Sequence, residues 1–194
     1  MRAFNGVQSP DGSGTGGKIF NLSIADGFGG DYFVGTIDEP NADVRTGLGG
    51  LSGRLILDTG TMRLAKWTFV DGNPLKDLEL VSEGALNGMA AIAWEIKVLS
   101  IHPTVITALA GADTFEKALE KDRGKPKLRM IVWKEVNGKL EKAAQANVGG
   151  KHREISLARM SIGTAPSTTN SGRFLSASRV GGDLKVSVWR ISDD

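Results

Sequence analysis

The stretch MAAIAWEIKVLSI, residues 89–101, is the longest segment of the chain in which alternate residues share one character. On an extended backbone, one side of this stretch carries large apolar residues and the other carries small or charged residues. The two sets are Ile92, Trp94, Ile96 and Val98, and Ala91, Ala93, Glu95 and Lys97. A period of two over this length predicts a half-buried β-strand. The opposite charges of Glu95 and Lys97 on the wetter side predict a position in the middle of an antiparallel sheet.

Runs of strand length also occur on both sides of this stretch, and each ends in residues that favour turns. We expect strands at 18–25, 31–38, 54–58, 62–70, 75–82, 127–136, 153–162, 173–180 and 184–191, whereas residues 139–146 fit a strand or a helix. Asn137-Gly138 is the strongest hairpin signal, and Gly181-Gly182-Asp183 predicts a second hairpin. This pattern predicts a mainly β fold, an antiparallel β-sandwich or distorted barrel of about ten strands.

Residues 103–124 break the strand pattern and predict a helical insertion. Pro103 fits a first helical turn, which is followed by an apolar stripe made by Val105, Ile106 and Leu109. Asp113-Thr-Phe-Glu116 has the character of a capping box, and Gly124 favours the end of a helix. We therefore expect one short helix near 113–123.

The composition is that of an ordinary globular protein, with 40% hydrophobic and 24% charged residues in a chain of 194. Residues 1–17 are rich in glycine and serine and predict a flexible arm, for which neighbouring chains are a natural partner. Residues 18–194 are expected to form a single β domain. The chain shows neither a signal pattern nor an uninterrupted apolar run of about 20 residues. We expect no membrane contact and a location in the cytoplasm, or in a virion if the protein is viral.

The net charge of +2 hides an uneven distribution. Residues 1–116 hold 8 basic and 14 acidic side chains, a net charge of −6, whereas residues 117–159 hold 12 and 5, a net charge of +7. Such asymmetry fits a nucleic-acid surface, a charge-complementary assembly contact, or simply two solvated faces of opposite charge. The basic side chains that we expect to contact a partner protein or a nucleic acid are Lys121, Arg123, Lys125, Lys127, Arg129, Lys151 and Arg153.

No motif for catalysis or cofactor binding fits its sequence context. The chain has no cysteine and two histidines, His102 and His152, so thiol chemistry is excluded and a zinc site would need carboxylate ligands. Residues 12–18 match the spacing of a phosphate-binding loop, but Ile19 stands where the hydroxyl residue belongs and a strand follows instead of a helix. No serine lies in a nucleophile elbow. We expect no catalytic residue, no cofactor and no metal.

Acidic and aromatic residues suggest two further kinds of site. Glu95 and Glu135 each neighbour a tryptophan and are the candidate carboxylate pair for glycoside cleavage. A sugar-stacking platform would use Trp67, Trp94, Trp133 and Trp189, although the alternation places Trp94 among core residues. Calcium ligands would come from Asp26, Asp31, Asp38, Glu39 and Asp43, whose spacing matches no EF-hand loop.

These observations favour a non-enzymatic structural or assembly protein, a capsid, decoration or tail component of a virus or phage particle. We expect it to act through charge-complementary contacts with other protein chains, as a homo-oligomer or within a larger assembly. One alternative is a nucleic-acid-binding protein that uses the basic segment 117–159 and loses affinity as salt rises. The other is a carbohydrate-binding β-sandwich module, whose tryptophan fluorescence would change when a glycan is added.

Overall fold

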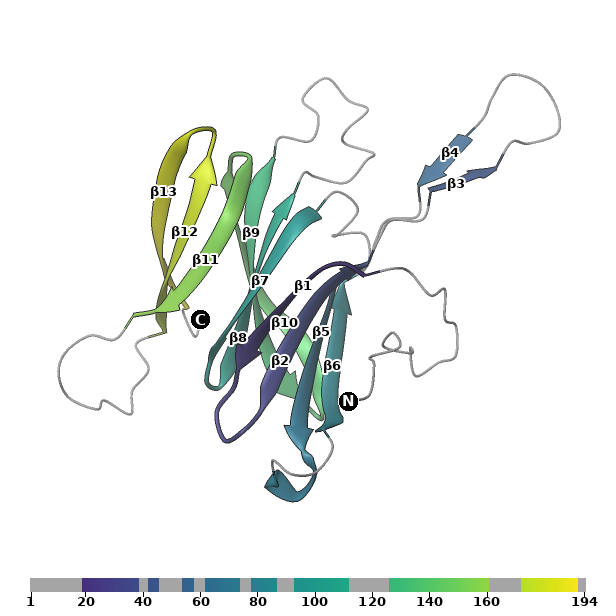
Figure 1. The fold of residues 1–194 in the computed structure, drawn as a ribbon, viewed down its shortest axis with the longest axis vertical. Helices are drawn as coiled ribbons and strands as arrows, with labels where there is room; N and C mark the ends of the chain where they lie inside the picture. The colour runs from purple at the N-terminus through teal and green to yellow at the C-terminus, as the bar shows by residue number, and fades with distance from the viewer. Residues whose placement is uncertain are drawn as a thin grey trace.

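The computed structural model of the chain describes residues 19–38, 42–45, 54–57, 62–73, 78–86, 93–111, 126–160 and 172–191. The arm predicted at 1–17 and the helix predicted near 113–123 lie outside these residues. The described part is almost entirely β-structure, which confirms the predicted fold class (Figure 1). Its only helical element is η1, a short 3-10 helix at Val70–Gly72.

Thirteen strands lie in the described part, more than the sequence predicts. Their bounds are β1 Ile19–Asp26, β2 Tyr32–Asp38, β3 Ala42–Arg45, β4 Arg54–Leu57, β5 Met62–Phe69, β6 Leu78–Leu86, β7 Ala93–Ile101, β8 Thr104–Gly111, β9 Lys127–Val136, β10 Lys139–Gly149, β11 His152–Arg159, β12 Arg173–Val180 and β13 Asp183–Arg190. A first sheet has the order β1-β2-β5-β6, a central sheet the order β10-β9-β8-β7 and a third sheet the order β11-β12-β13. The strands β3 and β4 pair separately.

The central sheet lies between the first and third sheets (Figure 1). A first core fills the space between the first and central sheets, with residues from β2, β5, β7, β8, β9 and β10. A second core lies between the central and third sheets, with residues from β7, β8, β9, β11 and β12. Both faces of the central sheet are therefore covered, and its inner strands β8 and β9 have long buried runs.

Strand β8 corrects the helical insertion predicted to begin at residue 103. All eight residues of Thr104–Gly111 are buried in an extended strand. Val105 belongs to the first core and Ile106 to the second, because successive side chains of a strand point to opposite faces. A strand that is buried on both faces has a continuous apolar run, and such a run does not differ in period from a buried helix.

Strand β7 confirms the strand predicted within residues 89–101, but its position and one of its faces differ from the prediction. It lies at the edge of the central sheet and not in the middle. The register opposite β8 shifts between Ala93 and Glu95, which is a β-bulge of one extra residue. Trp94 therefore packs on the second core, while Ile96 and Val98 belong to the first.

Two predicted hairpin turns are present. Asn137 and Gly138 have φ angles of 51° and 74°, as a type I′ turn requires, and they join β9 to β10. The return arm of this hairpin, left open between strand and helix by the sequence, is a strand. Gly181, with φ of 65°, begins the turn between β12 and β13, so that Val180 pairs with Asp183.

The first and central sheets also approach each other at the edges formed by β6 and β10. A Cβ atom added to Gly84 of β6 would collide with the carbonyl oxygen of Leu140 in β10 and lie 2.9 Å from the ring of Trp133. Only glycine allows the two backbones to come this close. On the opposite side of the sandwich, β1 packs along β7, as the hydrogen bonds described below show.

Candidate functional site

Side chains from two other sheets bond the outer backbone groups of β7. Asn21 Oδ1 accepts a hydrogen bond from the N–H of Ile96 at 3.2 Å, and Ser23 Oγ accepts one from the N–H of Val98 at 3.1 Å. On the same strand, the Ser100 carbonyl accepts a bond from Arg159 Nε at 2.6 Å. These side chains take the place of a neighbouring strand, so this edge is closed to other chains.

The polar role of β1 reverses the orientation that its sequence suggests. Asn21 and Ser23 face β7, whereas Leu22 and Ile24 are 55% and 60% exposed. Alternation alone would place the two aliphatic residues in the core. The need to bond the buried edge of β7 decides the orientation instead, because an unpaired buried N–H is costly.

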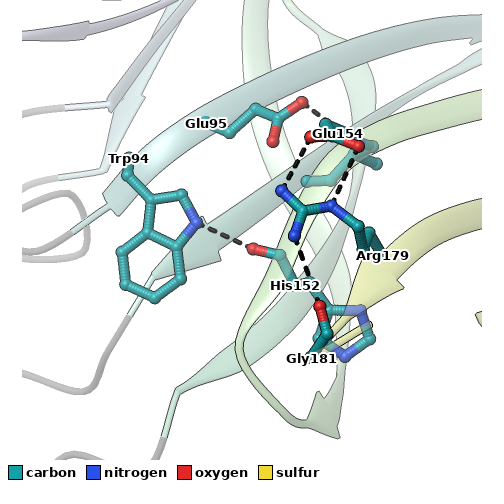
Figure 2. Close-up of polar contacts among 7 residues, drawn as sticks. Trp94, Glu95, His152, Glu154, Arg179 and Gly181 are labelled. Carbon is teal, nitrogen blue, oxygen red and sulfur yellow. Dashed lines mark hydrogen bonds and ion pairs between the residues drawn. The ribbon is translucent and has the colours of Figure 1, made fainter. Parts of the chain in front are cut away.

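A junction of four residues, Trp94, Glu95, His152 and Ile155, attaches β7 to β11 of the third sheet, and Figure 2 labels the first three of them. Trp94 Nε1 donates a hydrogen bond to the His152 carbonyl at 2.8 Å, and the Ile155 N–H donates to Glu95 Oε1 at 2.8 Å. The bulge in β7 makes this possible, because it turns both Trp94 and Glu95 toward the third sheet. Glu95 therefore has a structural hydrogen-bonding role at this junction.

His152 is the most deeply buried titratable residue of this region, with 1% of its surface exposed. Its Nδ1 lies 2.7 Å from Ser178 Oγ and its Nε2 lies 3.3 Å from the Gly149 carbonyl oxygen. A neutral ring satisfies both contacts when Nε2–H donates to Gly149 and Nδ1 accepts from the hydroxyl. Burial lowers the pKa of His152, against the hydrogen bond to Gly149, and the positive charge of Lys185 lowers it further.

Exposed charges surround the junction. Arg179 donates two hydrogen bonds to the Glu154 carboxylate, at 2.7 and 3.1 Å, and a third to the Gly181 carbonyl at 3.3 Å (Figure 2). The hydrogen bonds and charge of Arg179 lower the pKa of Glu154. Arg153 lies over the ring of Trp94, 5.7 Å from its centroid. Arg153 is thus engaged with an aromatic face of its own chain.

A cavity of about 460 Å³ opens at one end of the sandwich and contains an ionic cluster. Lys66 Nζ lies 3.0 Å from Glu135 Oε2 and 3.2 Å from Asp31 Oδ2. Burial lowers the pKa of Lys66, but its hydrogen bonds and the two negative charges outweigh burial and raise it overall. Lys66 therefore stays protonated and cannot act as a nucleophile near neutral pH. The cluster ties β5 to the end of β9.

The residues proposed for sugar chemistry do not come together. Glu95 faces the third sheet, whereas Glu135 bonds Lys66 at the cavity beside the first sheet. Trp133 is buried in the first core and donates to Thr107, while Trp94 and Trp189 pack on the second core. A stacking platform of all four tryptophans is therefore wrong for this fold, because the central sheet separates the ring of Trp133 from those of Trp94 and Trp189.

The basic residues predicted to contact a partner are only partly described. Lys121, Arg123 and Lys125 lie outside the described residues. Arg129 is 8% exposed, so it cannot bind a phosphate without rearrangement. Lys127 pairs with Gly149 at the end of the central sheet where exposed Lys151 also lies. The described part thus brings two lysines to one end of the sheet and does not gather the whole set.

Strand β13 is an edge strand whose outer face is aliphatic. Leu184, Val186 and Val188 alternate along it and are 76%, 55% and 63% exposed. Lys185, Ser187 and Trp189 occupy the other face, where Trp189 stacks on Phe174 at 6.1 Å between ring centroids and donates to Ser176. We call Leu184, Val186 and Val188 the β13 stripe. Sequence alternation identifies the stripe, but it suggests burial and not exposure.

The edges of the three larger sheets differ in how they are covered. β1 lies against β7, β11 bonds β7 from its other side, and β6 meets the first part of β10 at Leu140. Two stretches of the described part remain open, the length of β13 and the second half of β10. The open part of β10 carries small or polar side chains, Ala143, Ala144, Gln145, Ala146 and Asn147. Among the described edges of the three larger sheets, only β13 is open and also carries large exposed aliphatic side chains.

Two comparisons with known proteins give no match, so the function of this chain is inferred from the structural features described above. A scan against protein-family models and a search of curated proteins each found no match to this chain. Among the described residues, no three histidine or acidic side chains group in a way that could hold a metal ion, and Asp31 instead bonds an ammonium group. The described part also has no helix with the length and apolarity needed to cross a membrane.

Proposed function

We propose that this chain is a non-enzymatic structural protein that works by assembling with other protein chains. The observation that carries this proposal is the β13 stripe on an open sheet edge. Soluble proteins protect their edge strands with charges, bulges or covering segments, and this fold covers β1, β6, β7 and β11 in such ways. An edge left open with three exposed aliphatic residues is the feature expected of a contact surface.

The proposal includes a setting in a virus or phage particle that forms in the cytoplasm. Its support is the combination of a cysteine-free β chain with an acidic part, residues 1–116, and a basic part, residues 117–159. Opposite charges on one chain favour contact between neighbouring copies and steer their encounter. Such contacts fit a capsid, decoration or tail component.

Nucleic-acid binding through the basic segment is a weaker second candidate. Two of its described members, Arg129 and Arg153, are committed within the chain, one by burial and one by the ring of Trp94. Carbohydrate binding has less support still, since the tryptophans lie on different faces of the sheets. Neither alternative accounts for the β13 stripe.

The native mass of the purified chain, measured over a range of concentrations and salt, tests the proposal. We expect species heavier than the 20.6 kDa monomer that become more abundant with concentration. Contacts that depend on charge should weaken as salt rises, whereas aliphatic contacts should not. A single mass of one chain at every concentration and salt would contradict self-assembly.

A further inference from the structure

The backbone of β13 alternates between groups that bond β12 and groups that face the open edge. Val180 and Asp183 flank a two-residue turn, and such flanking residues exchange both backbone hydrogen bonds. Bonded pairs then recur at every second residue, at Lys185, Ser187 and Trp189. The N–H and C=O groups of Leu184, Val186 and Val188 therefore point away from β12, toward the open edge.

The outward backbone groups and the exposed side chains thus belong to the same three residues. A strand that pairs with this edge would bond the backbone of the β13 stripe and also set its own side chains beside those of the stripe, on the same face of the sheet. Both requirements are met by an edge strand in which every second residue is aliphatic and also turns its backbone N–H and C=O groups toward the open edge. β13 itself is such a strand, so a second copy of the chain provides a fitting partner.

We propose that β13 pairs in antiparallel fashion with β13 of a second copy, about a two-fold axis at Val186. This inference rests on the proposed assembly function and names its contact. In this register Val186 lies opposite Val186 of the partner subunit, and Leu184 lies opposite Val188 of the partner subunit. The pairing gives about six hydrogen bonds between the copies and joins two three-stranded sheets into one.

Two neighbouring registers also place the β13 stripes of both copies on the same face of the joined sheet, but both are less favourable. A shift of the axis to Lys185 places this lysine opposite its own copy, and like charges directly opposite are destabilising. A shift to Ser187 places Leu184 opposite Arg190 and leaves part of the stripe uncovered. Only the axis at Val186 sets every residue of the stripe against an aliphatic residue, while Lys185 meets Ser187 and Arg190 meets Gly182. The single best register is therefore also self-complementary.

The second half of β10 is the other open edge, but it fits this partner less well. Its side chains from Ala143 to Asn147 offer little aliphatic area to cover the stripe. A pairing of β13 with β10 would also be head-to-tail, which leads to rings or open filaments instead of closed dimers. A two-fold β13 contact predicts dimers as the unit of association.

Cysteine cross-linking in the full chain tests the register. The chain has no cysteine, so each substitution introduces a single thiol. Val186→Cys places two thiols opposite each other across a pair whose Cα atoms are about 5.5 Å apart, a distance that suits a disulfide. Val188→Cys and Leu184→Cys alone place their thiols four residues apart along the paired strands. The double variant Leu184→Cys, Val188→Cys restores two facing pairs.

Random collision and the proposed register predict opposite orders for the cross-linking rates of the single cysteine variants. Val186 is the least exposed of the three residues at 55%, compared with 63% for Val188 and 76% for Leu184. We expect Val186→Cys to form a covalent dimer at least tenfold faster than either other single variant under mild oxidation, and the double variant to match it. Ile24→Cys, at a residue 60% exposed on β1, measures the collision rate.

Two results separate this inference from the proposed function. If Val186→Cys cross-links no faster than Ile24→Cys while the native mass shows oligomers, the β13 pairing is wrong and assembly by another surface stands. If the native mass also shows only monomers, both proposals fail. Circular dichroism of each variant confirms that the β fold is intact, which exposed positions should allow.

Discussion

The sequence offers Glu95 as a candidate carboxylate for glycoside cleavage, whereas in the structure its side chain stabilises the packing of two sheets. Its Oε1 accepts the N–H of Ile155, and this bond holds the third sheet against β7. We expect Glu95→Ala to lower the free energy of unfolding by about 1–3 kcal/mol, because it leaves a backbone donor unsatisfied. Glu95→Gln keeps a carbonyl acceptor at the same place and should lose much less. Urea denaturation measures both, and an equal loss in the two variants would contradict this role.

His152 makes the stability of the fold depend on pH. Its folded-state pKa lies below the ordinary value of 6.5, so between these two values the unfolded chain binds a proton that the folded chain does not. The stabilisation is complete above pH 6.5 and is lost as the pH falls through the lower, folded-state pKa. We expect the free energy of unfolding to fall as the pH is lowered from the ordinary value of 6.5 through the lower, folded-state pKa of His152.

The variant His152→Gln should flatten this part of the pH profile, and the matched control His102→Gln, at an exposed histidine, should keep it. Glu154 acts in a different window, because Arg179 holds its folded-state pKa below the ordinary 4.5. The stabilisation from Glu154 is present above pH 4.5 and is lost as the pH falls through its folded-state pKa. An unchanged profile in His152→Gln would show that another group is responsible.

Sequence reasoning at the scale of residues succeeds for turns and fails where edges are bonded by side chains. Asn137-Gly138 predicts its hairpin because few residues tolerate the left-handed backbone that the turn needs. Trp94 is placed on the wrong face because a bulge inserts one residue opposite β8. This bulge allows Trp94 to bond His152 of β11, which lies 58 residues further along the chain. No local signal in the sequence marks a bulge that depends on such a distant contact.

At the scale of elements, β1 is a strand that stabilises its neighbour through polar side chains. We expect Ser23→Ala and Asn21→Ala each to cost about 1–3 kcal/mol, because each removes an acceptor from a backbone N–H of β7. Leu22→Ala, at the exposed position between them, should change stability by no more than about 0.5 kcal/mol. Thermal or urea unfolding of the three variants measures which of them loses the most stability. If Leu22→Ala were the most damaging, β1 would face the other way.

The contact between β6 and β10 predicts an intolerant glycine. Gly84→Ala adds a methyl group against the Leu140 carbonyl and the Trp133 ring, and we expect a loss of about 1–3 kcal/mol from this overpacking. Gly182→Ala in the turn between β12 and β13 is the control, since a Cβ there meets nothing within 4 Å. Unfolding midpoints of the two variants test this. Equal midpoints would mean that β6 and β10 do not approach closely.

Elements with one covered face are the ones that the sequence predicts well. β2, β5, β12 and β13 alternate and end in turn residues, and all were expected near their observed positions. β8 was expected to begin a helical insertion because both of its faces are buried, which removes the period of two. A third layer is what buries its second face, and no property of residues 104–111 alone reveals that layer.

At the scale of the whole molecule, the described part forms three layers of β-sheet whose edges are covered except along β13 and the second half of β10. The sequence predicts the fold class because strand length and turn chemistry are local properties. The order of sheets and the exposure of the β13 stripe depend on contacts between distant segments, so they appear only in the structure. The candidate contact surface was therefore absent from the residues singled out by charge, Lys121 to Arg153.

A charged residue in the stripe should weaken association and leave the monomer folded. Val186→Lys places an ammonium group on each side of the proposed two-fold axis, and we expect the dissociation constant to rise at least tenfold. Ile24→Lys makes the same change at a comparably exposed residue of β1 and should leave association unchanged. Sedimentation at several concentrations measures both. Equal weakening by the two variants would point to a general effect of charge.

Hydrogen exchange of the β13 amides, resolved by residue and compared at low and high protein concentration, tests the central claim most directly. The amides of Lys185, Ser187 and Trp189 bond β12 and should be protected at both concentrations, which provides an internal control. The amides of Leu184, Val186 and Val188 should exchange rapidly in dilute solution and become protected when the protein is concentrated. If these three amides exchange equally fast at both concentrations while heavier species are present, the chains do not assemble through this edge.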